Sequence, residues 1–384
     1  PHARSRHCVL GGLLLLAGPA PARAVCLVEI QFTAATNYVT GWNNTNVVTG
    51  DFDEDGITDL AVCNDYDLFS GGAGSDISIL LGRGDGSFDP HVDYLAGAKA
   101  HGLASGDFNE DGITDLAVCN KGSHNVSILM GLGSGGVGNG TFASAVNYPA
   151  GVSPFRIFAG DFNEDGIEDL AVSNNGAPAV TVLLGLGSGG VGNGAFGAPV
   201  SYGLNNLSTG LAIGDFNSDG IADLVATENY SGSIAVLRGN GSGGVGNGTF
   251  APAVHYPAGP EPYDITVHDF DSDGISDLAV ANTSFGGIAL MRGNGPRGIG
   301  DGTFAAPAFL PSGNNTNLLV AVAASPGKVI LYLGQGTGLV NAAEFGDPTD
   351  YQVGGDAIQT ALGDFNGDGK VDCAVTNYYD NFIS

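Results

Sequence analysis

The sequence has few charged residues, and very few of these are positive. Charged residues make up 14% of the 384 residues, with 12 Lys and Arg against 40 Asp and Glu and a formal net charge of -28. So few cations cannot form the basic stripe that neutralises phosphates, which excludes nucleic acid as a partner. Because 43% of the residues are hydrophobic, the chain is not a disordered acidic tail. The negative charge must therefore be concentrated locally.

Cysteines are also scarce, and their spacing carries no chemistry. None of the five forms a CxxC pair or lies at metal-ligand spacing from a histidine, so the sequence indicates neither a disulfide framework nor a zinc site. Cys63 and Cys119 occupy one position of a repeat, held elsewhere by Ser173, Thr227 and Ala281. That position is predicted to need a small buried side chain.

No apolar stretch reaches the 18 residues that a membrane-spanning helix needs. The run from Val9 to Ala17 follows two arginines and precedes a small-residue sequence that ends at Ala24, which predicts a signal peptide at residues 1–24. We therefore expect secretion to an extracellular, periplasmic or cell-surface location. Because the chain lacks an initial Met and ends inside a repeat, we expect a C-terminally truncated fragment.

Glycine and a repeated acidic motif dominate what the sequence does contain. The 65 Gly and 17 Pro are typical of a turn-rich β protein. The nine-residue motif DFDEDGITD recurs in six variants, loops 1 to 6, and their positions 1, 3, 5 and 9 hold 20 of the 40 acidic residues. The loops begin at Asp51, Asp107, Asp161, Asp215, Asp269 and Asp364.

The acidic loops predict about six Ca²⁺ sites, because oxygen side chains surround an invariant Gly at position 6. The backbone carbonyl at position 7 is the fifth expected ligand of each loop. An EF-hand is excluded, since its position 12 requires Glu and loop 1 has Val62 there. Asn at position 3 of four loops is expected to weaken those sites. The predicted ligands are Asp51, Asp53, Asp55, Ile57, Asp59, Asp107, Asn109, Asp111, Ile113, Asp115, Asp161, Asn163, Asp165, Ile167, Asp169, Asp215, Asn217, Asp219, Ile221, Asp223, Asp269, Asp271, Asp273, Ile275, Asp277, Asp364, Asn366, Asp368, Lys370 and Asp372.

Loops 1 to 5 recur every 54 to 56 residues, a period typical of propellers and other repeat architectures. The third unit contains four short apolar runs, at Phe155 to Ala159, Leu170 to Ser173, Val180 to Leu184 and Ala198 to Tyr202, with a Gly-rich loop before the last. Brief apolar runs predict strands covered on both faces. Four such strands form the blade of a β-propeller.

The motifs GDFN-DGI-DLAV and GNGTFAPAVHYPAG resemble FG-GAP or VCBS-type repeats, known from integrin α-subunit propellers, over residues 32 to 384. The resemblance implies an all-β domain at 25–384, a seven-bladed propeller with calcium between the first and second strands of a blade. The spacing alone also allows six or eight blades. The sixth unit is degenerate: about 14 residues are missing before Asn317, so it has three strands or has lost a piece of sequence. The run from Phe32 to Tyr38 is expected to close the ring by pairing with the C-terminal strands.

Function is expected on the face opposite the acidic loops, where aromatic side chains beside Asn and Asp suit a carbohydrate or a protein. The favoured function is non-enzymatic adhesion or ligand binding, as in the integrin-like repeats. The predicted ligand-face residues are Trp42, Tyr66, Tyr230, Tyr263 and Tyr378.

An enzyme is the alternative function, either a propeller of the polysaccharide lyase or hydrolase type or the accessory domain of a larger secreted enzyme. The sequence contains no GxSxG, HExxH or phosphate-binding loop and no convergent catalytic set. His101, Arg156 and Asp264 lie near the starts of inner strands and are a weak hint of a shared site. No catalytic residue is predicted.

Overall fold

The computed structural model describes residues 35–65, 76–271, 273–283, 287–310, 320–324, 328–332, 349–352, 357–370, 372–378 and 380–384. All of them belong to the unit Ala34–Ser384. Within these ranges the regular secondary structure is entirely β, and no helix is present that is long and apolar enough to cross a membrane. The predicted signal peptide at residues 1–24 and the gap before Asn317 lie outside the described residues.

Six four-stranded antiparallel sheets, called blades here, make up most of the unit. Blade 1 is β2 (Asn44–Gly50), β3 (Asp59–Asn64), β4 (Asp76–Leu80) and β5 (Val92–Leu95). Blade 2 is β6 (Ala100–Gly106), β7 (Asp115–Asn120), β8 (Asn125–Leu129) and β11 (Val146–Pro149). Blade 3 is β12 (Pro154–Gly160), β13 (Asp169–Asn174), β14 (Ala179–Leu183) and β17 (Val200–Gly203).

The remaining sheets follow the same order of strands. Blade 4 is β18 (Leu211–Gly214), β19 (Asp223–Glu228), β20 (Ser233–Leu237) and β23 (Val254–Pro257). Blade 5 is β24 (Pro262–His268), β25 (Asp277–Asn282), β26 (Gly287–Met291) and β27 (Ala308–Leu310). The terminal blade is β31 (Ala357–Gly363), β32 (Asp372–Asn377), β33 (Phe382–Ile383) and β1 (Tyr38–Val39). A three-stranded sheet contains β28 (Val320–Ala324), β29 (Lys328–Tyr332) and β30 (Thr349–Gln352).

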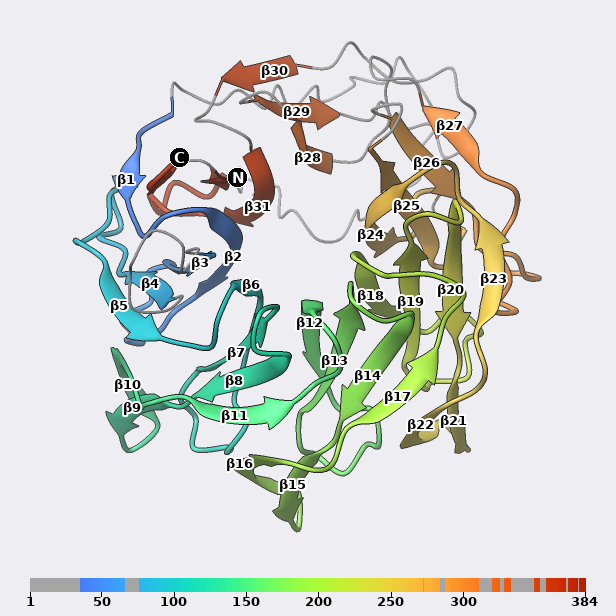
Figure 1. Cartoon of the computed structure of the whole chain (residues 1–384), viewed down its shortest axis with the longest axis horizontal. Helices are drawn as coiled ribbons and strands as arrows, with labels where there is room; N and C mark the ends of the chain where they lie inside the picture. The colour runs from blue at the N-terminus through green and yellow to red at the C-terminus, as the bar shows by residue number, and fades with distance from the viewer. Residues whose placement is uncertain are drawn as a thin grey trace, which may run out of the picture. The chain divides into compact units, whose positions relative to one another are not determined.

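The first strands of successive blades contact one another in the order β31, β2, β6, β12, β18, β24, and β28 also contacts β31 (Figure 1). Each hydrophobic cluster combines side chains from two adjacent blades, for example Leu170 of blade 3 with Ile128 of blade 2. The second strands of blades 1 to 4 are buried along their whole length, which explains their mainly apolar sequence. The unit is therefore a β-propeller with six four-stranded blades.

The four strands expected in the third unit are confirmed as β12, β13, β14 and β17, with ends shifted by up to two residues. The Gly-rich stretches, expected as loops, instead form hairpins in blades 2 to 4. Their second strand alternates exposed and buried residues, as in Val137–Phe142. Glycine hides this alternation in the sequence because it has no side chain. The hairpins are β9 (Gly131–Ser134) with β10 (Val137–Phe142), β15 (Gly185–Ser188) with β16 (Val191–Phe196), and β21 (Gly239–Ser242) with β22 (Val245–Phe250).

The phenylalanine at position 2 joins one blade to the next in five of the six acidic loops, all except loop 5 as far as the described residues show. Phe52 is 2% exposed, packs edge-on against Phe142 at 5.7 Å, and its carbonyl accepts a hydrogen bond of 3.0 Å from the Gly140 amide. Gly140 has φ of +71°, a left-handed conformation that favours glycine. The same contacts recur between later blades. They also link Phe365 of the terminal blade to Phe88 and the Gly86 amide of blade 1.

The small residue predicted at the Cys63 and Cys119 position is confirmed as fully buried in blades 1 to 4, and Ala281 of blade 5 is partly buried. It also contacts the next blade, since Cys119 Sγ lies 3.7 Å from the Arg156 carbonyl and Ser173 Oγ donates to the Thr209 carbonyl at 3.2 Å. In blades 1 to 3 the position therefore combines small size with a donor. The thiols are free, with no disulfide among the described residues.

Candidate metal centre

Each acidic loop connects the first strand of a blade to the second, so all six lie at the same end of their blades. In all six loops, position 9 is the first residue of the second strand of the blade. The Gly at position 6 has a positive φ, between +78° and +87°, in every loop. A side chain there would strain the turn, which accounts for the invariant glycine.

The carboxylate at position 9 fastens the loop to the blade. In loop 3 it belongs to Asp169, which is fully buried and accepts hydrogen bonds from the amides of Phe162 at 2.9 Å and Gly185 at 2.7 Å. Burial, only partly offset by these hydrogen bonds, raises the pKa of Asp169 and Asp115 to about 7. Burial likewise raises the pKa of Asp59, Asp223 and Asp277 to about 6. A nearby cation would favour the ionised form of these groups.

The carboxylates at positions 1 and 5 stabilise the turn by accepting hydrogen bonds from backbone amides of the loop. In loop 2, Asp107 Oδ2 accepts a hydrogen bond from the Gly112 amide at 2.8 Å, and Asp111 Oδ1 accepts one from the Ile113 amide at 2.9 Å. The position-7 side chains of loops 2 to 5, Ile113 among them, are buried at 3 to 4% exposure. The apolar side chain thus anchors the residue whose carbonyl was predicted as a ligand.

Position 3 separates the loops into two kinds. In loop 2 the Asn109 amide donates to Asp111 Oδ2 at 3.1 Å, and loops 3 and 4 repeat this bond. Loops 1 and 5 have Asp53 and Asp271 instead. Burial and then repulsion from the position-5 carboxylate raise the pKa of both. The Asn loops are therefore internally hydrogen-bonded, whereas the Asp loops hold like charges together.

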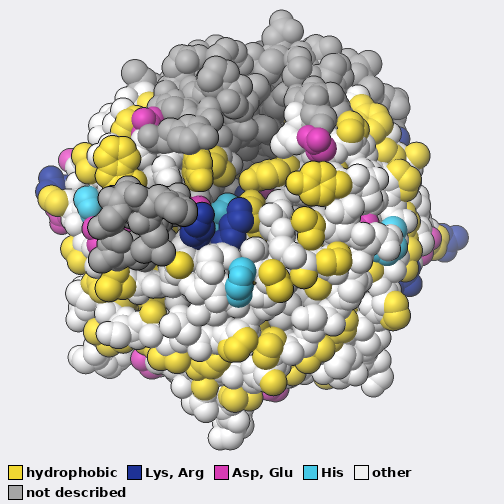
Figure 2. Space-filling view, in the orientation of Figure 1, with side chains coloured by type: hydrophobic (Ala, Val, Ile, Leu, Met, Phe, Trp, Pro, Cys, Tyr) yellow, Lys and Arg dark blue, Asp and Glu magenta, His cyan; other side chains and the backbone are white. Residues whose placement is uncertain are grey.

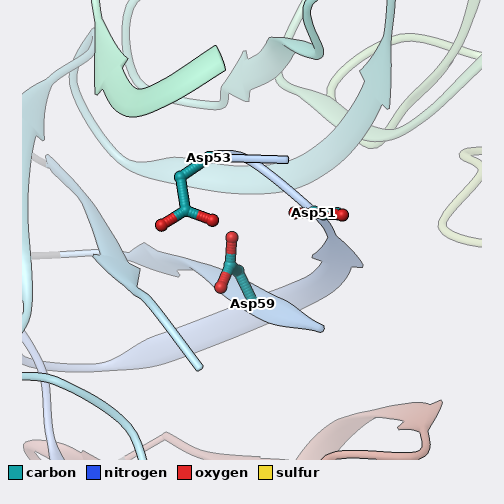
Figure 3. A group of neighbouring side chains, drawn as sticks. All are labelled: Asp51, Asp53 and Asp59. Carbon is teal, nitrogen blue, oxygen red and sulfur yellow. The ribbon is translucent and has the colours of Figure 1, made fainter. Parts of the chain in front are cut away.

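The Asp loops are also where three acidic side chains converge. Ligand atoms of Asp51, Asp53 and Asp59 all lie within 4.8 Å of one another, and Figure 3 shows the Asp53 and Asp59 carboxylates pointing toward each other. Asp51 Oδ1 is buried with no hydrogen-bond partner, so this site has an unused acceptor. An all-oxygen set of this kind fits a hard divalent cation such as Ca²⁺. The ion would supply only positive charge and coordination.

Loop 5 forms the second such group, from Asp269, Asp271 and Asp273. In this loop the chain itself supplies a positive charge, because the side chain of Arg292 forms an ion pair with Asp271, with Nη1 3.6 Å from Oδ2. In loop 6 the side chain of Lys370 pairs with Asp368 at 2.8 Å, and both are exposed. The six loops thus share one backbone design but differ in local charge.

The model of the FG-GAP-like repeat matches residues 64–118, 107–172, 161–226 and 215–280, which together cover more than half of the chain. This chain belongs to the FG-GAP-like repeat family. No curated protein matches it.

Solved structures resemble this FG-GAP-like repeat protein in fold. BBS1N in complex with ARL6DN has a TM-score of 0.55 at 10% identity, covering 91% of this chain and 94% of that one. The periplasmic gluconolactonase PpgL of Pseudomonas aeruginosa has 0.54 at 14%, covering 85% and 88%. A protein from Lactobacillus plantarum has 0.53 at 13%, covering 84% and 88%. At such identities the likeness shows the propeller fold alone.

Four of the five predicted ligand-face residues of the FG-GAP-like repeat protein are described, and they lie at the blade ends opposite the acidic loops, in several blades. Trp42 precedes β2 and is 54% exposed, and Tyr230 lies between β19 and β20 and is 73% exposed. Tyr263, in β24, is mostly buried and packs edge-on against Phe155 at 6.0 Å. Tyr378 is half-buried. Tyr66 lies outside the described residues.

His101, Arg156 and Asp264 also lie at this end, and the structure connects them. Arg156 is 6% exposed, and its Nη2 donates to Asp264 Oδ2 at 2.9 Å from blade 3 to blade 5. The His101 ring stacks on Phe155 with centroids 3.7 Å apart. Burial, together with Arg156 and Lys121, holds the pKa of His101 well below its usual value. Figure 2 shows Lys and Arg side chains beside a histidine near the middle of this face, where acidic side chains are few.

Glu228 and His255 form a polar cluster that sequence reasoning missed. Glu228 is fully buried, and its Oε2 lies 3.0 Å from His255 Nδ1. The signal was a break in the repeat, because the residue that ends the second strand is Asn in the other five blades, for example Asn174 and Asn282. The replacement of this Asn by Glu228 lies outside the acidic motif.

Proposed function

We propose that the chain is a secreted, calcium-stabilised propeller that binds a carbohydrate or protein ligand at the blade ends opposite its acidic loops. The observation that carries the calcium part is the oxygen cluster of Asp51, Asp53 and Asp59 with its unpaired buried Oδ1. Oxygen atoms at positions 1, 3, 5, 7 and 9 of all six loops are the proposed ligands. The apolar run at Val9 to Ala17 supports secretion.

Calcium in this account is a structural ion. Five of the loops carry a Phe that contacts the neighbouring blade, so ordering the loop also orders the interface between blades. A site at about tenfold excess of free calcium over its dissociation constant contributes about 1.4 kcal/mol by mass action. Six such sites together are comparable to the total stability of an ordinary domain.

The proposed ring has seven blades, and the three-stranded sheet β28–β29–β30 is its reduced sixth blade. Support comes from β28, which contacts β31 of the terminal blade. Strand β1 is the proposed closure of the ring. Its residues Tyr38 and Val39 pair antiparallel with Ile383 and Phe382 of β33, so the first and last described strands share a sheet.

The ligand-binding part is supported by exposed aromatic side chains opposite the acidic loops. Trp42 and Tyr230 expose large rings that the core does not use, and such rings often carry binding energy at interfaces. The complex of BBS1N with ARL6DN shows that one propeller of this fold has a protein partner. The same kind of partner is proposed here alongside sugars.

The calcium-loaded protein, tested on a glycan array and in pull-downs with surface extracts, is expected to retain a glycan or a protein. Trp42→Ala and Tyr230→Ala are expected to reduce retention at least about tenfold without changing the melting temperature, because both rings are exposed. Leu132→Ala, an exposed change in the hairpin beside the acidic loops, is the matched control. Retention by both aromatic variants equal to wild type would place the ligand elsewhere, and turnover of a polysaccharide without retention would favour the enzyme alternative.

A further inference from the structure

A groove between the outer strands of blades 3 and 4 encloses a cavity of about 370 Å³. Tyr202 and Gly203 of β17 line one side, and Phe250 and His255 line the other. The size lies within the range of small-ligand sites in proteins. Tyr202 and Phe250 meet edge-on at 5.5 Å, a pair that recurs between other blades as Tyr148 with Phe196. The groove framework therefore belongs to the repeat, and the cavity depends on what differs here.

Gly203 is the first difference. The residues at the same register in the fourth strands of blades 1, 2 and 4 are Leu95, Pro149 and Pro257. A Cβ atom added to Gly203 would meet nothing within 4 Å. Loss of the usual side chain thus leaves open space at the end of β17.

His255 is the second difference, and Glu228 makes it a defined acceptor. Equivalent residues are Asp93, Asn147 and Ser201 in blades 1 to 3. The Glu228 carboxylate accepts hydrogen bonds from the Asn205 amide and from Ser233 Oγ, both at 2.6 Å. Because a carboxylate only accepts, the 3.0 Å contact with His255 requires the proton on Nδ1.

This arrangement leaves Nε2 of His255 as an acceptor on a side chain that is 30% exposed and lines the cavity. A histidine with its other nitrogen held by a buried carboxylate has a fixed ring orientation and tautomer. Such orientation is needed for recognition or catalysis and is unnecessary for packing. In blade 2, Asn120 takes the place of Glu228 and Asn147 the place of His255. Asn120 donates a hydrogen bond to Ser127, and Ser127 donates one to Asn147.

We propose that this groove is a binding site for a neutral, polyhydroxylated ligand, a pyranose sugar. The cavity combines aromatic and small apolar surface from Tyr202, Phe250 and Ala253 with polar atoms of Ser201 and His255. A sugar ring has apolar C–H faces and hydroxyl donors, which match the two kinds of surface. A negative ligand fits less well, because the chain carries a net charge of -28 and His255 has a carboxylate behind it. The groove lies in blades 3 and 4, whereas Trp42 of the proposed ligand face precedes β2 in blade 1.

The test is saturation-transfer NMR of the full chain with the methyl glycosides of glucose, galactose, mannose and N-acetylglucosamine. At least one glycoside is expected to receive saturation. His255→Asn removes the imidazole and its Nε2 acceptor from the cavity, and Gly203→Pro fills the cavity with the residue of blades 2 and 4. Each is expected to weaken binding about tenfold, because a hydroxyl loses its partner or its space. In the wild type, the long-range ¹H–¹⁵N signals of His255 are expected to show unprotonated Nε2 and to shift on binding.

Control variants keep folding and location apart. Both substitutions use residues that the repeat accommodates at the same register, so melting temperatures are expected to stay within a few degrees of wild type. Asn147→Ala, in the equivalent position of blade 2, and Trp42→Ala, in blade 1, are expected to leave glycoside binding unchanged. No saturation of any glycoside, or saturation that both groove variants preserve, would overturn the sugar site. Because Trp42→Ala tests the ligand face, either proposal can fail alone.

Discussion

The two ends of the blades differ in how closely they repeat. At the acidic end, the position-9 carboxylate accepts the position-2 amide in all six loops, at 2.7 to 3.0 Å. At the other end, the first strands of blades 1, 2, 3 and 5 each have a register shift in their pairing with the second strand, but the residue at this shift differs from blade to blade. It is Thr45, His101, Phe155 and Tyr263 in turn. The uniform end serves the stability common to all blades, and the varied end offers surfaces that are particular to this protein.

The largest expected effect comes from removing a position-9 carboxylate. Asp169→Ala leaves the buried amides of Phe162 and Gly185 without partners, which costs about 3 to 5 kcal/mol of unfolding free energy. Urea denaturation with EDTA present measures this cost apart from calcium. Asp165→Ala, an exposed change in the same loop, is the control and is expected to cost less than about 1 kcal/mol there. Equal losses from the two variants would mean that the carboxylates do not differ as described.

A smaller effect is expected from converting one kind of loop into the other. Asn109→Asp removes the hydrogen bond to Asp111 and adds a like charge, so the calcium-free protein is expected to lose about 1 kcal/mol. Calcium titration by calorimetry is expected to show tighter binding at that loop. The reverse change, Asp53→Asn, is expected to stabilise the calcium-free protein and to lower the calcium affinity of loop 1. Unchanged affinity in both variants would contradict the assignment of position 3 as a ligand.

His101, at the varied end, makes its own contribution to the pH dependence of stability. His101 is 6% exposed with a pKa well below 6.5, so below about pH 6.5 the unfolded chain binds a proton that the folded chain does not. Stability is therefore lost as the pH falls, by about 2 kcal/mol between pH 6.5 and 5 for this group. His101→Thr, which copies Thr45 of blade 1, is expected to remove that share. Denaturation curves at the two pH values measure it, and an identical slope in the variant would show that His101 does not titrate this way. The charged groups that face it are Arg156 and Lys121.

The sequence predicted the strand order and loop positions because both follow from a repeated pattern of apolar runs and turns. It placed β12, β13, β14 and β17 within two residues. The Gly-rich hairpins could not be predicted, because the alternation of exposed and buried residues in their strands involves glycines and is not marked by alternating apolar and polar side chains. Blade 3 shows both cases, since β13 is readable from Leu170 to Ser173 and β16 is hidden by glycine.

The candidate sites divide in the same way. Loop ligands could be predicted because the spacing of oxygen atoms is local in sequence, within nine residues. The contact between Arg156 and Asp264 spans 108 residues and depends on how the first strands of blades 3 and 5 approach each other, so only their shared position near strand starts could be predicted. Glu228 and His255 pair through the register of three strands in one blade. Such contacts follow from the fold rather than from a motif.

The most direct test is thermal unfolding of the chain with millimolar calcium and with EDTA at pH 7.5. Six structural sites are expected to raise the melting temperature by about 10 °C or more in calcium, and by much less in magnesium, which dehydrates reluctantly. Asp169→Ala and Asn109→Asp should shift this difference, whereas Trp42→Ala should leave it unchanged. Identical melting temperatures in calcium and EDTA would contradict the claim that the acidic loops bind an ion that stabilises the blades.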